Sequence, residues 1–201
     1  MKSLRLLLVI SIGVTAYLGD YIVFKSKYSG SLLFRALADS SVHGAIGFLS
    51  ALSFFSNIKI TSQACIYNTI FCTFMSSVID VDHFFVARSI YLKDLTNISQ
   101  RGILHCTTFW MMVTSILALY SHLTHKINVY IVTYMLVLAF TSHHLRDGNR
   151  RGIWLCPLGH TMPVNKFLYV ILICILPTLF AYLFNYTKPM FKHTVFNYIE
   201  L

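Results

Sequence analysis

Charged residues are scarce in this sequence: Asp, Glu, Lys and Arg occupy only 11% of its 201 positions. In soluble domains about a quarter of the residues are charged, so the composition argues against a soluble protein. A hydrophobic content of 56% and a mean hydropathy of +0.66 indicate an integral membrane protein. Because the chain has no internal repeat, low-complexity tract or soluble segment, we expect one integral membrane domain over residues 1–201.

Acidic residues are scarcer than basic ones, with 7 Asp and Glu against 16 Lys and Arg. The basic residues stand in short tracts between apolar runs, which is typical of loops that face anionic lipid head groups. We therefore expect the lipid bilayer as a partner and no nucleic acid.

Several short motifs are missing as well. The five cysteines are odd in number and form no C-x-x-C pair, which argues against a disulfide framework or a zinc knuckle. The chain also has no G-x-S-x-G turn and no Walker-type phosphate loop. Any chemistry must therefore depend on aspartate or on a water activated by a metal.

Six apolar runs are long enough to cross a bilayer, which takes about 20 residues each. They predict an all-α fold, a polytopic bundle of about six transmembrane helices. The first run resembles a secretory signal, but it continues past Asp20, which favours a membrane helix. The runs cover Leu4–Phe24, Leu37–Phe55, Ala64–Phe85, Ile103–Tyr120, Asn128–Leu145 and Phe167–Tyr186.

The loops differ in charge on the two sides of this predicted bundle. Loops one, three and five share a side and hold ten of the 16 basic residues. Positive charge is enriched in cytoplasmic loops, so we expect a multi-pass protein whose odd-numbered loops lie in the cytoplasm. The sequence does not indicate which membrane holds it.

Ionisable residues gather at the helix ends that face these odd loops. Six of the seven acidic residues lie on that side, and Glu200 is the exception. The segment S-V-I-D-V-D-H-F-F, residues 77–85, places Asp80, Asp82 and His83 in a strongly apolar run. Asp82 would point away from Asp80 on an ideal helix. We therefore expect a frayed helix end, where both carboxylates turn toward one centre.

Clustered carboxylates in a membrane protein need a compensating cation. Aspartate oxygens together with imidazole nitrogens suit a divalent metal, most of all Zn²⁺, with Mn²⁺ or Fe²⁺ also possible. The number of candidate ligands allows one or two ions. The expected metal ligands are His43, Asp80, Asp82, His83, His105, His143 and Asp147.

Four segments carry a family resemblance. In order, S-V-I-D-V-D-H-F, R-G-I-L-H-C-T, S-H-H-L-R-D and G-I-W-L-C-P resemble the D-x-D-H, H-R-G-x-T-H and S-H-x-x-x-D motifs of bacterial membrane-bound metal-dependent hydrolases, with their following glycine and proline. The longer phrases A-L-A-D-S-S-V-H-G-A-I-G and T-S-H-H-L-R-D-G-N-R-R-G-I-W-L-C-P-L-G are more closely similar to the animal transmembrane protein 267 family.

The hydrolase resemblance implies a helical metallohydrolase related to zinc-dependent phospholipases C, and it nominates the same seven ligands. Two positions depart from its motifs, because Gln100 replaces the first histidine of H-R-G and Leu104 replaces the threonine before His105. The loss of one ligand implies a single-metal enzyme or a site that binds metal without turnover.

The predicted function is hydrolysis of a phosphoester in a lipid or lipid-linked substrate. Asp82 and Asp147 are the expected catalytic carboxylates, and Arg146, Arg150 and Arg151 are expected to bind the substrate phosphate. The same arginines also suit a role in membrane topology.

Other interpretations stay open at this point. The whole cluster also suits a non-catalytic scaffold with a structural metal, or a proton or divalent-cation transporter. Asp39 also suits an N-cap. Finally, the D-V-D-H aspartates have Arg101 or Arg146 as alternative ion-pair partners.

Overall fold

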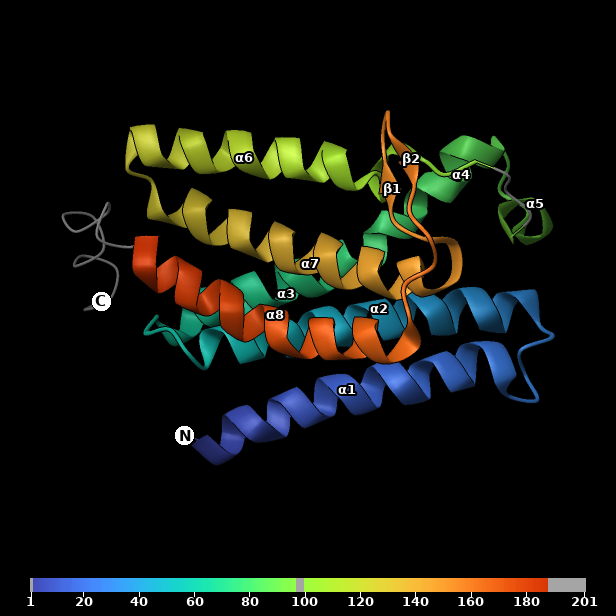
Figure 1. Cartoon of the computed structure of the whole chain (residues 1–201), viewed down its shortest axis with the longest axis horizontal. Coiled ribbons are helices and arrows are strands. Elements are labelled where there is room, and N and C mark those ends of the chain that lie inside the picture. Colours follow the sequence, from blue (N-terminus) through green and yellow to red (C-terminus); the bar gives the residue numbers. More distant parts are fainter. Residues whose placement is uncertain (1, 97–99, 188–201) are drawn as a thin grey trace.

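A computed structural model of the chain describes residues 2–96 and 100–187 and gives an all-α protein (Figure 1). Glu200 lies outside the described residues. Six of the described helices are at least 17 residues long, and they run up and down along one direction. The elements are α1 (Lys2–Lys25), α2 (Leu32–Phe55), α3 (Ser62–Val78), the 3₁₀ turn η1 (Ile79–Val81), α4 (Asp82–Ala87), α5 (Leu92–Thr96), the 3₁₀ turn η2 (Ile103–His105), α6 (Thr107–Thr124), α7 (Ile127–Arg151), β1 (Trp154–Leu155), β2 (Gly159–His160) and α8 (Lys166–Thr187).

Three of the described helical segments are long and apolar enough to cross a membrane: Lys2–Lys25, Ser62–Ala87 and Lys166–Thr187. The sequence predicted about six spans, and α2, α6 and α7 do not confirm that count. All three carry buried polar side chains, such as Ser50 of α2, Thr114 of α6 and Ser142 of α7. These groups lower the mean hydropathy of a helix although they face the interior of the bundle.

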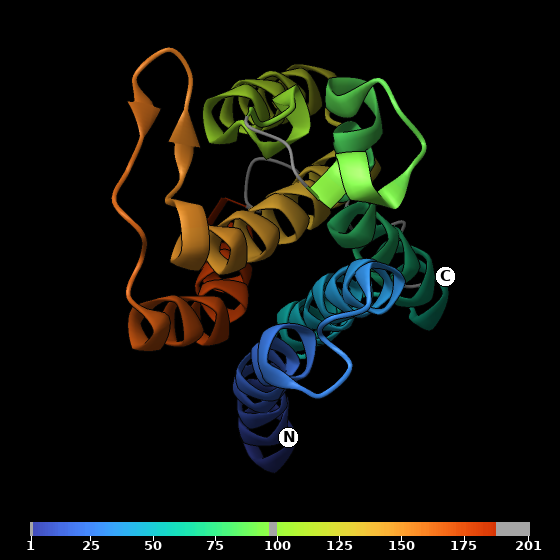
Figure 2. The same ribbon diagram turned by 90° about the vertical axis from the view of Figure 1, so that its right-hand side faces the viewer.

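Helix α7 occupies the middle of the bundle. It packs against α2, α3, α6 and α8, and Figure 2, which views the molecule from the end that carries α4, α5 and the hairpin, shows these helices around it. Its buried residues occur on all sides of the helix and include Arg146 and Asp147. The ionisable side chains of His143, His144, Arg146 and Asp147 are therefore enclosed by other parts of the chain.

Side-chain caps fix where two helices begin. The Ser31 hydroxyl accepts a hydrogen bond from the Phe34 amide at the start of α2, and the Thr61 hydroxyl accepts one from Ala64 at the start of α3. The N-cap of α2 is thus Ser31, eight residues before Asp39. The interpretation of Asp39 as an N-cap is wrong, because the helix extends further toward its N-terminus than the apolar run.

Helices α2 and α3 approach closely at Gly47. A Cβ atom added there would lie 2.7 Å from the Cβ of Ser76, so no larger residue fits without a shift. The Cys72 thiol also donates a hydrogen bond to the Gly47 carbonyl, at 3.5 Å. This contact holds the end of α3, where Ser76 lies, against α2.

The loops at one end of the bundle hold the less regular structure. Helix α3 narrows into η1 at Ile79–Val81 and continues as α4, and the short antiparallel strands β1 and β2 pair Trp154 with His160. Figure 1 shows α4, α5 and both strands at the end opposite the N-terminus. The frayed helix end expected around Asp80 and Asp82 is this 3₁₀ turn.

Candidate metal centre

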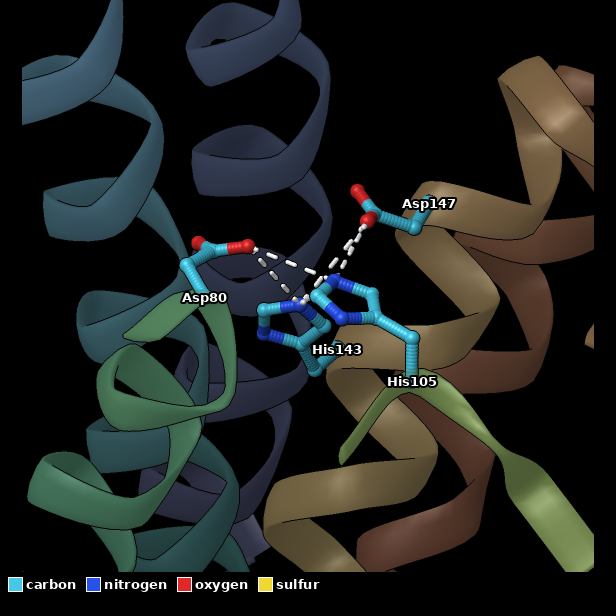
Figure 3. A group of neighbouring side chains, drawn as sticks. All are labelled: Asp80, His105, His143 and Asp147. Atoms are coloured by element: carbon cyan, nitrogen blue, oxygen red, sulfur yellow. Dashed lines mark hydrogen bonds and ion pairs between the residues drawn. The ribbon is translucent and has the colours of Figure 1, made fainter. Parts of the chain in front are cut away.

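Four side chains from three separate elements meet at this end of the bundle (Figure 3). They are Asp80 from η1, His105 from η2, and His143 and Asp147 from α7. One potential ligand atom of each lies within 4.8 Å of the others. Because His143 and Asp147 are four residues apart, they point the same way from α7.

The distances among these atoms suit a four-coordinate ion. The Nε2 atom of His105 lies 3.4 Å from Asp80 Oδ1, 3.4 Å from Asp147 Oδ2 and 3.4 Å from His143 Nε2. The Nε2 atom of His143 lies 3.5 Å from Asp80 Oδ1 and 3.8 Å from Asp147 Oδ2. A tetrahedron with metal–ligand bonds of about 2.0–2.1 Å has edges of about 3.3–3.4 Å, so these five separations are equal to or slightly longer than such edges.

Hydrogen bonds on the other side of each ring set the histidine tautomers. The Nδ1 atom of His143 donates to the carbonyl of Ser76 at 2.8 Å, and Nδ1 of His105 donates to the Asp82 carboxylate at 3.0 Å. With both Nδ1 atoms engaged in this way, the two Nε2 atoms face the centre, 3.4 Å from each other. Outer hydrogen bonds of this kind are typical of metal-ligating histidines.

The other three predicted ligands flank this group of four. The buried Asp82 carboxylate contacts His105 from the side away from the centre. His83 stacks on His105 with ring centroids 4.9 Å apart, and Asp82, His83 and His105 form a second, smaller group of possible ligands. His43 stacks on His143 at 3.7 Å, and its Nε2 lies 3.5 Å from Asp147 Oδ1.

Arg146 takes part in a buried ion network that joins three helices. Its Nε atom lies 3.0 Å from Asp20 Oδ1 of α1, and a terminal nitrogen lies 2.7 Å from Asp39 Oδ1 of α2. The hydroxyl of Tyr169, on α8, donates to the second oxygen of Asp20. Arg146 itself is 1% exposed. Its side chain thus faces α1 and α2, whereas the sequence predicted that it binds the substrate phosphate.

The alternative ion pairs for the D-V-D-H aspartates are not found. Within the two described ranges, neither Asp80 nor Asp82 forms an ion pair with an arginine. Arg146 is paired with Asp20 and Asp39, and Arg101 donates to the carbonyl of Gly152 at 2.9 Å. The partners of both aspartates are histidines.

A cavity of about 330 Å³ opens beside the centre and is lined by Asp80, His105 and Asp147. Arg150 and Arg151, predicted to bind phosphate, line it too. Two further arginines in its wall, Arg35 and Arg101, were missed by the sequence analysis. In the sequence, the i,i+4 spacing of Arg35 and Asp39 places both on one face of α2, and Arg101 begins the segment R-G-I-L-H-C-T that resembles H-R-G-x-T-H.

Arg150 links the cavity wall to the centre. Its terminal nitrogen lies 2.6 Å from Asp147 Oδ1 and 3.5 Å from Asp39 Oδ2. Burial disfavours its charge, but the Asp147 and Asp39 carboxylates outweigh burial and hold the pKa of this guanidinium above its usual value. Asp147 therefore presents Oδ2 to the centre while Oδ1 is bound by a permanent cation.

Sequence comparison finds relatives over most of the chain. The chain is 39% identical to Transmembrane protein 267 of Xenopus laevis over 145 residues, which cover 72% of this chain and 66% of the relative. It is 34% identical to Transmembrane protein 267 of Danio rerio over 177 residues, 88% of this chain and 79% of the relative. The protein of the same name from Bos taurus is 37% identical over 154 residues, 76% of this chain and 70% of the relative.

The other comparisons find no match. No protein-family model matches the chain, and no solved structure matches it. The resemblance to bacterial metal-dependent hydrolases is therefore not supported by any comparison, in contrast to the resemblance to the animal family.

Proposed function

This chain belongs to the transmembrane protein 267 family, and we propose that it is a membrane-embedded, metal-dependent hydrolase that acts on a phosphoester. The observation that carries the proposal is the convergence of Asp80, His105, His143 and Asp147 beside a cavity with arginines in its wall. The two carboxylates and two imidazoles supply a mixed oxygen and nitrogen set that suits Zn²⁺.

The four residues would bind the ion, and neighbouring side chains would keep these ligands in position. A bound divalent ion lowers the pKa of water and stabilises charge on phosphoryl oxygens. Asp82 fixes the ring of His105 through Nδ1, which makes it a positioning residue rather than a proton carrier. His83 lines the cavity and stacks on His105, so it is placed to accept the proton of the attacking water.

The phosphate site of the proposed enzyme differs from the sequence prediction in its arginines. Arg151 keeps its proposed role, since it lines the cavity, whereas Arg150 lines the cavity but is paired with Asp147. Arg146 is buried against Asp20 and Asp39, so we do not assign it to phosphate binding. Arg101, which lines the cavity, takes its place in the proposal. A guanidinium can bind phosphate through two parallel hydrogen bonds.

We also propose that all six long helices cross the membrane, with the metal centre near the cytoplasmic face. The central position of α7 supports this arrangement, because its polar residues contact other helices and not lipid. The up-and-down order of the helices places all odd-numbered connections at the end that holds the centre. The loops at that end also carry most of the basic residues, which is typical of the cytoplasmic side.

A non-catalytic scaffold is the second candidate. Structural zinc sites have four protein ligands, whereas catalytic zinc sites have three protein ligands and a water. The four donors around this centre favour the structural role if all of them bind at once. The two candidates differ in turnover and agree on metal binding.

Metal analysis of detergent-purified protein separates these candidates. We expect about one zinc or manganese per chain in the wild type, and loss of that metal in His105→Ala. His160→Ala, which removes an exposed imidazole at the same end of the bundle, serves as the control. Chelator-sensitive release of phosphate from lipid phosphoesters then supports the hydrolase. Metal without turnover supports the scaffold, and a wild type without metal contradicts both.

A further inference from the structure

The lining of the cavity beside the centre combines two chemically different sets of side chains, a cationic wall and an apolar wall. One wall is cationic, and its four arginines outnumber the three carboxylates of the lining, Asp39, Asp80 and Asp147, even before a divalent ion is counted. The other wall is apolar. The cationic wall holds Arg35, Arg101, Arg150 and Arg151, and the apolar wall holds Leu33, Leu37, Val81, Phe84, Leu92 and Leu95.

The apolar wall is continuous with the outer surface of the bundle. Leu37 is 61% exposed and Phe84 is 43% exposed, although both also line the cavity. Phe84 and Val81 belong to the segment Ser62–Ala87, which is long and apolar enough to cross a membrane. Leu37 and Phe84 therefore connect the cavity with the outer surface of the bundle, where this segment would meet acyl chains.

The cationic wall favours a ligand with negative charge. Arg150 is engaged with Asp147, and Arg101 lies close enough to donate to the Gly152 carbonyl. Arg35 lies over the ring of Phe24, 5.9 Å from its centroid, and forms no ion pair with a carboxylate within the described part of the chain. An anionic group in the cavity would thus gain charge-assisted hydrogen bonds without breaking the Arg150–Asp147 pair.

We propose that the cavity binds one membrane phospholipid, with its phosphate at Arg35, Arg101 and Arg151 and its acyl chains leaving past the exposed side chains of Leu37 and Phe84. A volume of about 330 Å³ accommodates a head group and the first carbons, since it falls at the low end of ligand pockets. The remaining carbons stay in the bilayer. This inference rests on the proposed hydrolase function for its purpose and deepens it by naming the substrate class.

A water-soluble phosphate ester fits the same cavity less well. It would bind the arginines but would make no favourable apolar contact with Leu33, Leu37, Val81 and Phe84. A neutral lipid would make contacts with the apolar wall but would leave the arginines without an anionic partner. A phospholipid matches both walls at once.

Binding to the metal-free protein tests the inference independently of turnover. Protein in detergent is treated with EDTA, and native mass spectrometry measures binding of dioleoyl phosphatidate, dioleoylglycerol and inorganic phosphate at equal concentration. We expect phosphatidate to bind at least about tenfold more tightly than either of the others, because a tenfold ratio needs about 1.4 kcal/mol. Equal binding of dioleoylglycerol, or displacement of phosphatidate by equimolar phosphate, overturns the proposal.

Two pairs of variants then locate the ligand. Arg35→Gln with Arg101→Gln should weaken phosphatidate binding about tenfold, since two charge-assisted hydrogen bonds are lost. Lys25→Gln, an exposed cation at the same end, should not. Phe84→Trp should narrow the opening and weaken binding, whereas Leu119→Trp on the exposed face of α6 should not. Unchanged binding in both test variants overturns the proposal.

The outcomes separate this inference from the hydrolase itself. If the protein binds phosphatidate but the wild type as purified contains no metal, the hydrolase proposal is contradicted and the lipid site is retained. If the protein contains metal and hydrolyses a soluble phosphoester but does not bind phosphatidate, the hydrolase proposal is retained and the lipid site is contradicted. The selectivity among the three probes is measured on the wild type, so it holds even where a variant fails to fold.

Discussion

The Nδ1 atom of His143 lies 2.8 Å from the carbonyl oxygen of Ser76, so the last turn of α3 orients a ring that belongs to α7. The Nε2 atom of the same ring then faces Asp80, which follows Ser76 by four residues. One short stretch of chain thus supplies both a ligand and the hydrogen-bond acceptor of another ligand. The position of α3 against α2, set by Gly47, therefore bears on the geometry of the centre.

Asp82→Asn tests the outer hydrogen bond to His105. The amide keeps the size of the carboxylate but loses its charge, so it holds the His105 ring less firmly. We expect zinc affinity to fall about 10- to 100-fold, as for other outer-shell partners of metal ligands. Competition with a chelator of known affinity measures the change. An unaltered affinity contradicts the positioning role, while Asp80→Ala provides the comparison in which a direct ligand is lost.

Gly102→Ala tests the same contact from the other side. A Cβ at residue 102 would lie 2.7 Å from the Cβ of Asp82, so the carboxylate must move. We expect weaker zinc binding with the helical circular dichroism spectrum retained. Gly30→Ala is the matched control, because a Cβ there meets nothing within 4 Å. Equal zinc affinity in both variants would show that Asp82 has room to adjust.

Arg146→Met should destabilise the bundle by about 3–5 kcal/mol, because it leaves the Asp20 and Asp39 carboxylates without their shared cation. Adding Asp20→Asn and Asp39→Asn should recover most of that loss. Denaturant titration in detergent micelles measures the free energy of unfolding. If the triple variant is no more stable than Arg146→Met, the ion network is not the cause.

Removing the metal should lower the thermal stability of the wild type. Two carboxylates and two imidazoles then lose the ion that holds them together, and a ligand at 100 times its Kd contributes about 2.7 kcal/mol. We expect added Zn²⁺ to restore the melting temperature of EDTA-treated wild type but not of His105→Ala. A rise of equal size in both proteins would place the zinc elsewhere.

Single cysteines in a cysteine-free background test the six-span arrangement. An impermeant maleimide should label Lys59→Cys and Thr124→Cys in intact cells or sealed vesicles from one side. Lys27→Cys and His160→Cys should react from the other, cytoplasmic side. Labelling of Lys27→Cys and Lys59→Cys from the same side would mean that α2 does not cross the membrane.

The sequence predicted the all-α class, and it predicted the long helices to within a few residues at most ends. The largest errors concern polar ends, where apolar content is a poor guide to helix length. Helix α2 begins at Leu32 and not at Leu37, because the Ser31 cap and the partners of Asp39 stabilise a turn that hydropathy alone excludes. Helix α7 likewise continues to Arg151, six residues past its apolar run.

The site was predictable as a cluster but not in its details. Spacing alone places His143 and Asp147 on one face, and a turn at Asp80 and Asp82 follows from their opposed directions on a helix. Which residues meet depends on packing between distant segments. Arg146 illustrates this limit, since only the arrangement of α1, α2 and α7 pairs it with Asp20 and Asp39.

The order of the elements along the chain also bears on how the protein is made. Every residue of the four-ligand group precedes α8, which begins at Lys166. The four side chains can therefore come together once α7 has packed against α3, before α8 joins the bundle. Helix α8 then brings the Tyr169 hydroxyl to Asp20 and adds a hydrogen bond to the neighbouring ion network.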